Sequence, residues 1–156
     1  MYSTAKEMMT TQVQSIGPEE SIQAATEVLA KYNISGLPVV DENRRVIGIL
    51  SSSDIVKFSG QSHIINLVSS SGWVSPYTDV AAMTSLNKGF EMLGKKKVKE
   101  IMTRKVITVP EAAKADEVAR ILAKKKINRL PVTDPNGALV GIITRTDLIS
   151  AMAKED

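Results

Sequence analysis

The stretch Gly48-Ile49-Leu50-Ser51-Ser52-Ser53-Asp54 occurs twice in this chain, the second time as Gly141-Ile142-Ile143-Thr144-Arg145-Thr146-Asp147. Each occurrence has a glycine, two apolar residues, a hydroxyl residue and, three positions after the hydroxyl residue, an aspartate. The two are 93 residues apart (141 − 48). An apolar run that leads into Ser/Thr-x-x-Asp predicts a strand followed at once by a helix.

Two further stretches repeat at the same offset. Lys6-Glu7-Met8-Met9-Thr10 returns as Lys99-Glu100-Ile101-Met102-Thr103, and Leu37-Pro38-Val39-Val40-Asp41 returns as Leu130-Pro131-Val132-Thr133-Asp134. The copies therefore align without a gap (99 − 6 and 130 − 37 are both 93). Such a duplication predicts two like halves packed about a pseudo-two-fold axis, with equivalent paired grooves that suit ligand sensing.

The size and composition of the chain predict one compact protein. The chain has 156 residues, 43 % hydrophobic and 24 % charged, and each copy of about fifty residues is too small to bury much core alone. We therefore expect the copies to share one core. No stretch approaches the roughly twenty apolar residues of a membrane span. The start lacks an apolar signal region, and there are no cysteines, so we expect a cytoplasmic location.

Each copy is expected to consist of strand, helix, strand, strand and helix. In the first copy these elements are expected at 13–16, from 17–20 onward, at 37–40, at 46–50 and from 51. In the second copy they are expected at 106–109, from 110–111 onward, at 130–133, at 139–143 and from 146. The residues expected to face inward from the two long helices are Ile22, Ala25, Leu29, Tyr32, Ala115, Val118, Ile121 and Leu122. The turns are expected at 41–44 and at Asp134-Pro135-Asn136-Gly137, whose Asn-Gly is a strong hairpin signal.

The stretch between the copies has no repeat partner. A structureless loop of that length is uncommon in a compact domain, so we expect it to be partly helical, with an apolar stripe of Val80, Met83, Phe90 and Leu93. Trp73 is expected to pack against the protein, although a partner contact or a lid is also possible. The lysine runs 95–97 and 124–126 favour solvated helix ends over a nucleic-acid footprint.

Catalysis has little support in this sequence. There is one histidine, His63, no cysteine and no Gly-x-Ser-x-Gly elbow, so neither a metal site nor a nucleophile triad is expected. We therefore expect a protein that is not an enzyme and has no catalytic cofactor.

The repeated Ser/Thr-x-x-Asp motif permits two interpretations. The glycine before it allows close backbone approach, the helix N-terminus favours an anion, a hydroxyl can bind phosphate, and an aspartate can accept hydrogen bonds from both ribose hydroxyls. Together these groups fit a nucleoside phosphate. The same motif is also a capping box, which stabilises a helix start without any ligand. Its occurrence at equal positions of a duplicated unit favours the ligand.

The ordered set of Met-Thr, apolar strand, amphipathic helix, Leu-Pro-Val-x-Asp and Gly-apolar-apolar-Ser/Thr-x-x-Asp resembles the cystathionine-β-synthase (CBS) domain. Two copies resemble a CBS pair, or Bateman module. The expected boundaries are 6–58 for the first CBS domain, 59–98 for the connecting segment and 99–152 for the second. Because little lies outside the pair, the chain is similar to a stand-alone CBS-domain protein or to a pair excised from a longer one.

The resemblance implies an α/β (α+β) fold of two β-α-β-β-α units in one module. It also implies a regulatory protein that senses AMP, ADP or ATP in clefts between the copies and passes a conformational change to a partner. S-adenosylmethionine is another ligand of the family, and a homodimer is its usual assembly. The alternatives are a ligand-free scaffold or dimerisation module and a nucleic-acid binder.

The resemblance also implies site residues, because family members share each site between the copies. One cleft would contain Ser51, Asp54, Thr103, Ile107, Asn128 and Arg129. The other would contain Thr144 and Asp147, facing Thr10, Gln14, Ser35 and Gly36, with Ile142 beside the adenine. In these roles the aspartates bind ribose and the hydroxyl residues bind phosphate. Arg129 supplies a charge-assisted contact, so its cleft is expected to prefer phosphorylated ligands.

Overall fold

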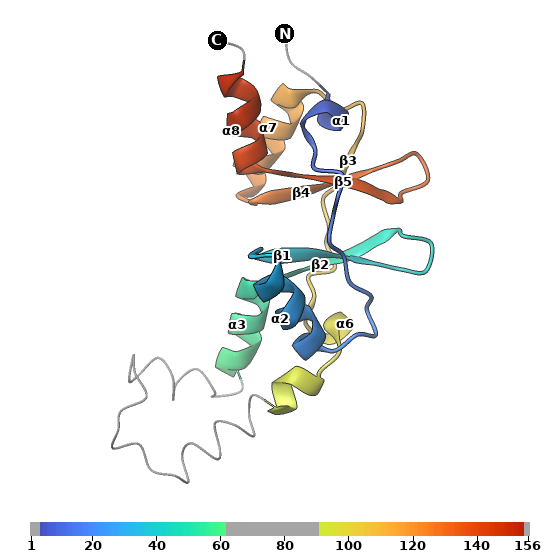
Figure 1. Ribbon diagram of the computed structural model, residues 1–156, viewed down its shortest axis with the longest axis vertical. Coiled ribbons are helices and arrows are strands. Elements are labelled where there is room, and N and C mark those ends of the chain that lie inside the picture. The colour runs from blue at the N-terminus through green and yellow to red at the C-terminus, as the bar shows by residue number, and fades with distance from the viewer. Residues whose placement is uncertain (1–3, 62–90, 155–156) are drawn as a thin grey trace, which may run out of the picture. The chain divides into compact units, whose positions relative to one another are not determined.

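The computed structural model describes residues 4–61 and 91–154 (Figure 1). The chain divides into two compact units. Unit 1 contains residues 1–15, 40–47 and 105–156, and unit 2 contains residues 16–39 and 48–104. Each unit therefore takes its long helices from one copy and shorter segments from the other, and unit 1 includes the hairpin turn 40–47 of the first copy.

Unit 1 has a three-stranded sheet with β4 (Arg129–Thr133) in the centre. β3 (Val109–Pro110) pairs parallel with β4, and β5 (Leu139–Thr144) pairs antiparallel with it. The helices α7 (Ala115–Lys125) and α8 (Arg145–Ala153) lie on one face of the sheet, together with the short helix α1 (Ala5–Met8) (Figure 1). The predicted α/β fold of the second copy, β-α-β-β-α, is confirmed.

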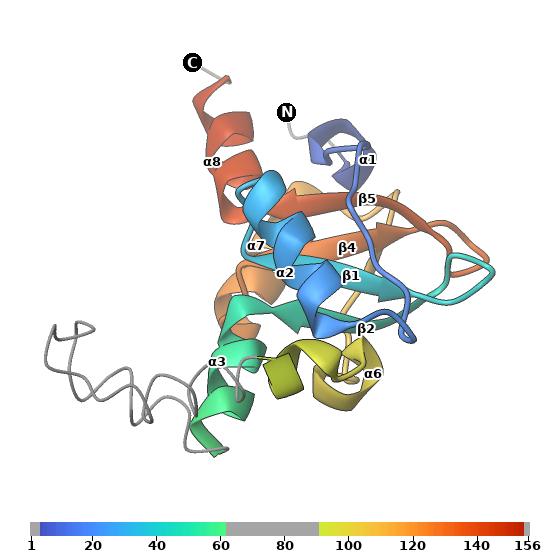
Figure 2. The same cartoon turned by 60° about the horizontal axis from the view of Figure 1, so that its bottom comes forward.

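Unit 2 repeats this arrangement with one strand fewer. β1 (Gly36–Val40) and β2 (Val46–Ser51) form a two-stranded sheet, and Ile16 adds a single parallel bridge to Val39. Its helices are α2 (Ile22–Lys31), α3 (Ser52–Gln61) and the short α6 (Val98–Ile101). Figure 2 shows α2 and α3 on the same side of this sheet. The Ile16–Val39 bridge corresponds to the Val109–Val132 pair of unit 1.

The first strand of each copy is much shorter than predicted. In place of a strand at 13–16 only Ile16 is paired, and in place of one at 106–109 the strand β3 begins at Val109. The alternating sequence is compatible with a strand, but the other residues have no neighbouring strand to pair with among the residues that the structure describes. Backbone pairing, not side-chain alternation, decides where a strand exists.

The long helices begin later than predicted. Ser21 caps α2 by accepting a hydrogen bond from the amide of Ala24 (3.1 Å), and residues 17–20 form a turn instead. Similarly, residues 110–113 form a turn and α7 begins at Ala115. The prediction that Tyr32 faces inward was wrong, because it caps the end of α2 and is 45 % exposed. The other predicted inward positions are buried, apart from Ile121, which is half-buried.

The buried positions of the two units repeat with the offset of the sequence. Six fully buried or nearly fully buried pairs are Ile22/Ala115, Ala25/Val118, Leu29/Leu122, Leu37/Leu130, Val39/Val132 and Leu50/Ile143. The sequence predicted one core shared by the copies. The structure instead has a compact core in each unit, so the mutual dependence of the copies has another origin.

That origin is an exchange of short segments. In unit 1 the helix α1 of the first copy docks on the second copy, with hydrogen bonds from the amide of Ala5 to the carbonyl of Ala113 (2.7 Å) and from that of Lys6 to Glu111 (3.0 Å). Ala5 and Met8 are part of the hydrophobic core of this unit. Neither this four-residue helix nor α6 was predicted from the sequence.

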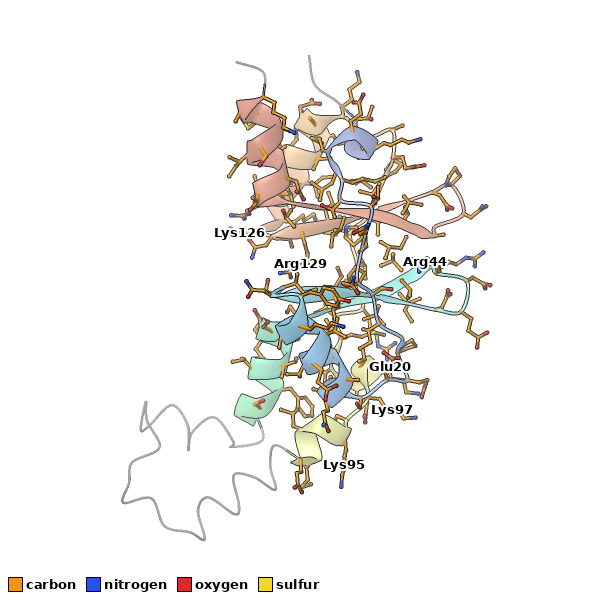
Figure 3. The ribbon with its side chains drawn as sticks, viewed as in Figure 1. Glu20, Arg44, Lys95, Lys97, Lys126 and Arg129 are labelled. Carbon is orange, nitrogen blue, oxygen red and sulfur yellow. The ribbon has the colours of Figure 1, made fainter. Side chains whose placement is uncertain are left out.

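The helix α6 makes the equivalent contacts in unit 2. The amide of Val98 donates to the carbonyl of Glu20 (2.8 Å), and that of Lys99 donates to Pro18 (3.0 Å). Figure 3 shows Lys97 beside the loop that carries Glu20. Val98 is fully buried. The carbonyls of the turn before each long helix therefore receive the segment of the other copy, which explains why these turns are not helical.

The repeated glycines lie directly under the methionines of these segments. A Cβ atom on Gly48 would be 3.1 Å from Cγ of Met102, and one on Gly141 would be 2.9 Å from Cβ of Met9. The glycines therefore permit a close approach, and the group that approaches is the methionine side chain of the exchanged segment.

The hairpin turns follow the prediction. Oδ1 of Asp41 accepts from the amides of Asn43 and Arg45 (2.9 Å each), and Oδ1 of Asp134 accepts from two equivalent amides (2.8 and 3.0 Å). Gly137 has a φ of 82° in its turn, where glycine is favoured. The equivalent Arg44 adopts a φ of 60°.

Most of the predicted connecting helix lies outside the described residues, as do His63 and Trp73. Of its expected apolar stripe, Leu93 is described, and it is buried and helical. Lys124 and Lys125 form the exposed last turn of α7, as the helix-end interpretation predicts. No helix within residues 4–61 and 91–154 is long and apolar enough to cross a membrane.

Ionic contacts add to the docking of α6. Oε2 of Glu19 lies 2.7 Å from Nζ of Lys97, and its Oε1 lies 2.6 Å from Nζ of Lys99. The hydrogen bond from Lys97, followed by that from Lys99, lowers the pKa of Glu19 from 4.5 to about 2. The position equivalent to Glu19 in the other copy is Ala112, which has no carboxylate to form the equivalent ionic clamp.

Gly141→Ala is expected to lower the free energy of unfolding by about 1–3 kcal/mol, because the new methyl group meets the rigid Cβ of Met9. Urea denaturation measures this loss. The control is Gly17→Ala, whose Cβ would have 3.9 Å to its nearest neighbour. An equal loss in both variants would contradict the role assigned to the Met9 contact.

Glu19→Gln is expected to lower the melting temperature at neutral pH and low salt, because it removes the clamp. A carboxylate with a lowered pKa stabilises the fold above its unfolded pKa and loses that effect as the pH falls. The difference from the parent chain should therefore shrink between pH 4.5 and about 2, and also in high salt. The control is Glu20→Gln, since Glu20 makes no ion pair with any described residue. A loss that is independent of pH would contradict this account.

Candidate functional site

The first Ser/Thr-x-x-Asp motif lies where β2 ends and α3 begins. Oγ of Ser51 accepts a hydrogen bond from the amide of Asp54 (3.2 Å). In return, Oδ2 of Asp54 accepts from both the amide and the hydroxyl of Ser51 (2.9 Å each). The reciprocal bonds have the geometry of a capping box. Both side chains are half-buried.

The second motif has the same geometry between β5 and α8. Oγ1 of Thr144 accepts from the amide of Asp147 (3.3 Å), and Oδ2 of Asp147 accepts from the amide (2.8 Å) and the hydroxyl (3.0 Å) of Thr144. The capping-box interpretation is thus confirmed for both copies. It does not exhaust the motif, because each cap uses one carboxylate oxygen and leaves the other for further donors.

In unit 2 the exchanged segment brings a third predicted residue to the motif. Thr103 pairs with Ile49 through two backbone hydrogen bonds (3.0 and 2.8 Å). Its hydroxyl donates to Oδ1 of Asp54 (3.1 Å). Ser51, Asp54 and Thr103 therefore lie together, around the N-terminus of α3. The N-terminus of a helix is a place that favours an anion.

In unit 1 the equivalent segment reaches the equivalent place. Thr10 pairs with Ile142 through two backbone hydrogen bonds (2.9 and 3.0 Å), beside the strand that ends in Thr144. Thr10 is exposed and Ile142 is half-buried. Unlike Thr103, Thr10 makes no hydrogen bond to the aspartate of its unit within the described part of the chain.

A cluster of polar and basic groups surrounds the start of β4. The amide of Arg145 donates to the carbonyl of Asn128 (3.3 Å), and Nε of Arg145 donates to the carbonyl of Ile127 (3.2 Å). The exposed guanidinium of Arg145 is thereby held against the residues that lead into β4. Figure 3 shows Lys126 and Arg129 at the adjoining ends of α7 and β4.

The other predicted site residues lie in varied surroundings. Ser35 precedes β1, and its carbonyl accepts from the amide and the hydroxyl of Ser52 (2.9 and 3.2 Å). Ile107 packs against the core of unit 1. Gln14 is half-buried. Their roles in ligand binding stay predictions.

Sequence reasoning missed the contribution of the methionines. Met9 and Met102 cover the repeated glycines and so fix the segments that carry Thr10 and Thr103. The signal for this contact was present, because the Met-Thr pair and the glycine both repeat at the offset of 93. Among the described residues, no three His, Asp or Glu side chains are grouped so that they could hold a metal ion.

Comparison with known proteins gives one family. The model of the CBS domain matches residues 5–60 and 98–154. The chain is 36 % identical over 126 residues to the uncharacterized protein MJ1426 of Methanocaldococcus jannaschii, covering 78 % of this chain and 75 % of that protein. It is 31 % identical over 136 residues to the inosine-5'-monophosphate dehydrogenase of Aquifex aeolicus, but spans only 21 % of that enzyme.

Two solved structures illustrate the likeness in fold. The complex of CBSX2 with AMP has a TM-score of 0.72, 27 % identity and 97 % coverage of both chains. The CBS domain pair of protein MJ0100, in complex with 5'-methylthioadenosine and S-adenosyl-L-methionine, has a TM-score of 0.73 and 28 % identity, and the match covers both chains completely.

Proposed function

This chain belongs to the CBS domain family, and on that premise we propose that it is a regulatory module that senses adenosine nucleotides. The two Ser/Thr-x-x-Asp motifs bind the ligand, and the resulting conformational change acts on a partner protein. A ligand causes such a change only if it binds one state more tightly than another.

The observation that carries the proposal is the pair of aspartates at equivalent helix starts. Asp54 and Asp147 are each fixed by their own cap through Oδ2, so that Oδ1 has a defined position. A carboxylate oriented in this way accepts hydrogen bonds from ribose hydroxyls without first losing conformational freedom. The helix N-termini beside them suit phosphate, whereas the hydroxyls of Ser51 and Thr144 already donate to the two aspartates.

The similar proteins support this class of ligand. CBSX2 binds AMP, and the MJ0100 pair binds 5'-methylthioadenosine and S-adenosyl-L-methionine. These three ligands have an adenosine group in common. Arg129, in the basic group around the start of β4, is our proposed phosphate partner, and it favours AMP, ADP or ATP over S-adenosylmethionine as the ligand of its site.

The remaining attributes of the protein stay predictions of the proposal. They are a role without catalysis, a cytoplasmic location and a homodimeric state. Exposed apolar side chains on α8, Ile149 (65 %) and Met152 (57 %), together with Val56 (56 %) on α3, favour self-association. Sedimentation at micromolar concentration tests it, and a monomer there would contradict the dimer.

A ligand-free scaffold is the alternative that the geometry also supports. The capping boxes explain why the two motifs have the same geometry without any ligand. Under this alternative, substitution of either aspartate weakens a helix and changes nothing else. Calorimetric titration separates the two functions.

Titration of the chain with AMP, ADP, ATP and S-adenosylmethionine is expected to show micromolar binding of at least one nucleotide. Asp54→Ala and Asp147→Ala are each expected to remove one class of sites, since each deletes a ribose acceptor. Arg129→Ala should weaken AMP more than adenosine, because adenosine lacks the phosphate.

The controls for this titration are variants of the two aspartates that accept amide hydrogen bonds in the hairpin turns. Asp41→Ala and Asp134→Ala remove the same type of carboxylate from turns that are not proposed to bind ligand. Absence of binding by all four ligands, or equal loss in the turn variants, would contradict nucleotide sensing and favour the scaffold.

A further inference from the structure

The two proposed ribose acceptors differ in the hydrogen bonds they already make. Oδ2 of each aspartate accepts two hydrogen bonds from its own cap. Oδ1 of Asp54 also accepts the hydroxyl of Thr103 (3.1 Å). For Asp147, the residue equivalent to Thr103 is Thr10, and no hydrogen bond joins that pair. Within residues 4–61 and 91–154, Oδ1 of Asp147 has no donor.

This difference decides how many new donors each carboxylate can accept. An ionised carboxylate offers about four acceptor positions. Asp54 has three of them occupied, and Asp147 has two. The two adjacent hydroxyls of a ribose need two acceptor positions. Asp147 can therefore accept both hydroxyls in its present geometry, whereas Asp54 can accept both only if Thr103 moves away.

On the basis of the proposed function, we infer that a nucleoside bound at Asp54 displaces the hydroxyl of Thr103, whereas binding at Asp147 requires no such displacement. Thr103 then acts as an internal competitor of the ribose. The Asp54 site binds the same ligand less tightly than it would without Thr103, and its occupancy changes the protein as well as filling a site.

The position of Thr103 indicates which contacts would change when ligand displaces its hydroxyl. Thr103 follows α6, which packs against α3, and its hydroxyl is a side-chain link from this segment to the first turn of α3. The backbone pair with Ile49 and the cover of Met102 over Gly48 remain when that link is broken. The expected result is a looser α6 that stays docked. In the sequence, α3 and α6 flank the connection between the copies.

The first test uses AMP and a chain in which only the Asp54 site remains. In an Asp147→Ala background, Thr103→Val is expected to tighten AMP binding about three- to tenfold, because it deletes one hydrogen bond to a charged group that the ligand must break. Thr103→Ser keeps the hydroxyl and should retain the parent affinity. Asp147→Asn, which keeps an acceptor for the α8 cap, serves as a second background if Asp147→Ala does not fold.

The matched variant in the other copy is Thr10→Val in an Asp54→Ala background. It deletes the equivalent hydroxyl where no competing bond exists, so no gain in AMP affinity is expected. Unchanged or weaker binding by Thr103→Val would overturn the inference, and so would an equal gain from Thr10→Val.

The second test follows α6 itself by hydrogen exchange of residues 98–103. Thr103→Val without ligand is expected to exchange faster than the parent chain. AMP is expected to raise exchange there in the Asp147→Ala variant but not in Asp54→Ala. Slower or unchanged hydrogen exchange with AMP would overturn this inference but leave the proposed function intact. Failure of AMP to bind the parent chain would overturn the proposed nucleotide, and the inference with it.

Discussion

The exchange of short helices between the copies is the constraint on which the rest of this structure depends. α1 contributes Ala5 and Met8 to a core whose other members come from the second copy. In the same way, α6 contributes the fully buried Val98 to the unit that is built on the first copy. Complete burial of a valine side chain is worth about 1.5–3 kcal/mol. A single copy would leave the docking place of the exchanged helix empty, so that neither copy completes its core without the other.

The same exchange assembles the candidate sites. The segments that follow α1 and α6 pair with β5 and β2 and so bring Thr10 and Thr103 to the Ser/Thr-x-x-Asp motifs. Close pairing requires glycine at positions 48 and 141, because a side chain there would collide with a methionine. Binding and folding thus use the same atoms. The carboxylate that is proposed to accept ribose also caps a helix, which is why tests of function need variants that separate the two roles.

The duplication, the fold class, the inner faces of the long helices and the hairpin turns could be predicted from the sequence. These features depend on local patterns: apolar spacing, Asp and Gly in turns, and the repeated motif. The sequence was not sufficient for α1 and α6, because a four-residue helix is unstable in isolation and exists here only through packing. The strands expected at 13–16 and 106–109 failed for a related reason, since their existence depends on pairing partners that no local pattern specifies.

The candidate site could be predicted in part. Ser51, Asp54 and Thr103 were predicted together, and in the structure the hydroxyls of Ser51 and Thr103 both donate to the carboxylate of Asp54. The inequality of the two aspartates could not be predicted, because Thr10 and Thr103 are identical in sequence and differ only in geometry. Nor could the contact of Arg145 with the carbonyl of Ile127 be predicted, because the two residues are 18 positions apart in the sequence.

The most direct test of this account is a nuclear Overhauser experiment on the intact chain with labelled methionine methyl groups. The exchange predicts cross-peaks from Met9 to Gly141 and from Met102 to Gly48, in agreement with the contacts of each glycine. Cross-peaks from Met9 to Gly48 and from Met102 to Gly141 would mean that each copy folds on its own segment, and would contradict the account.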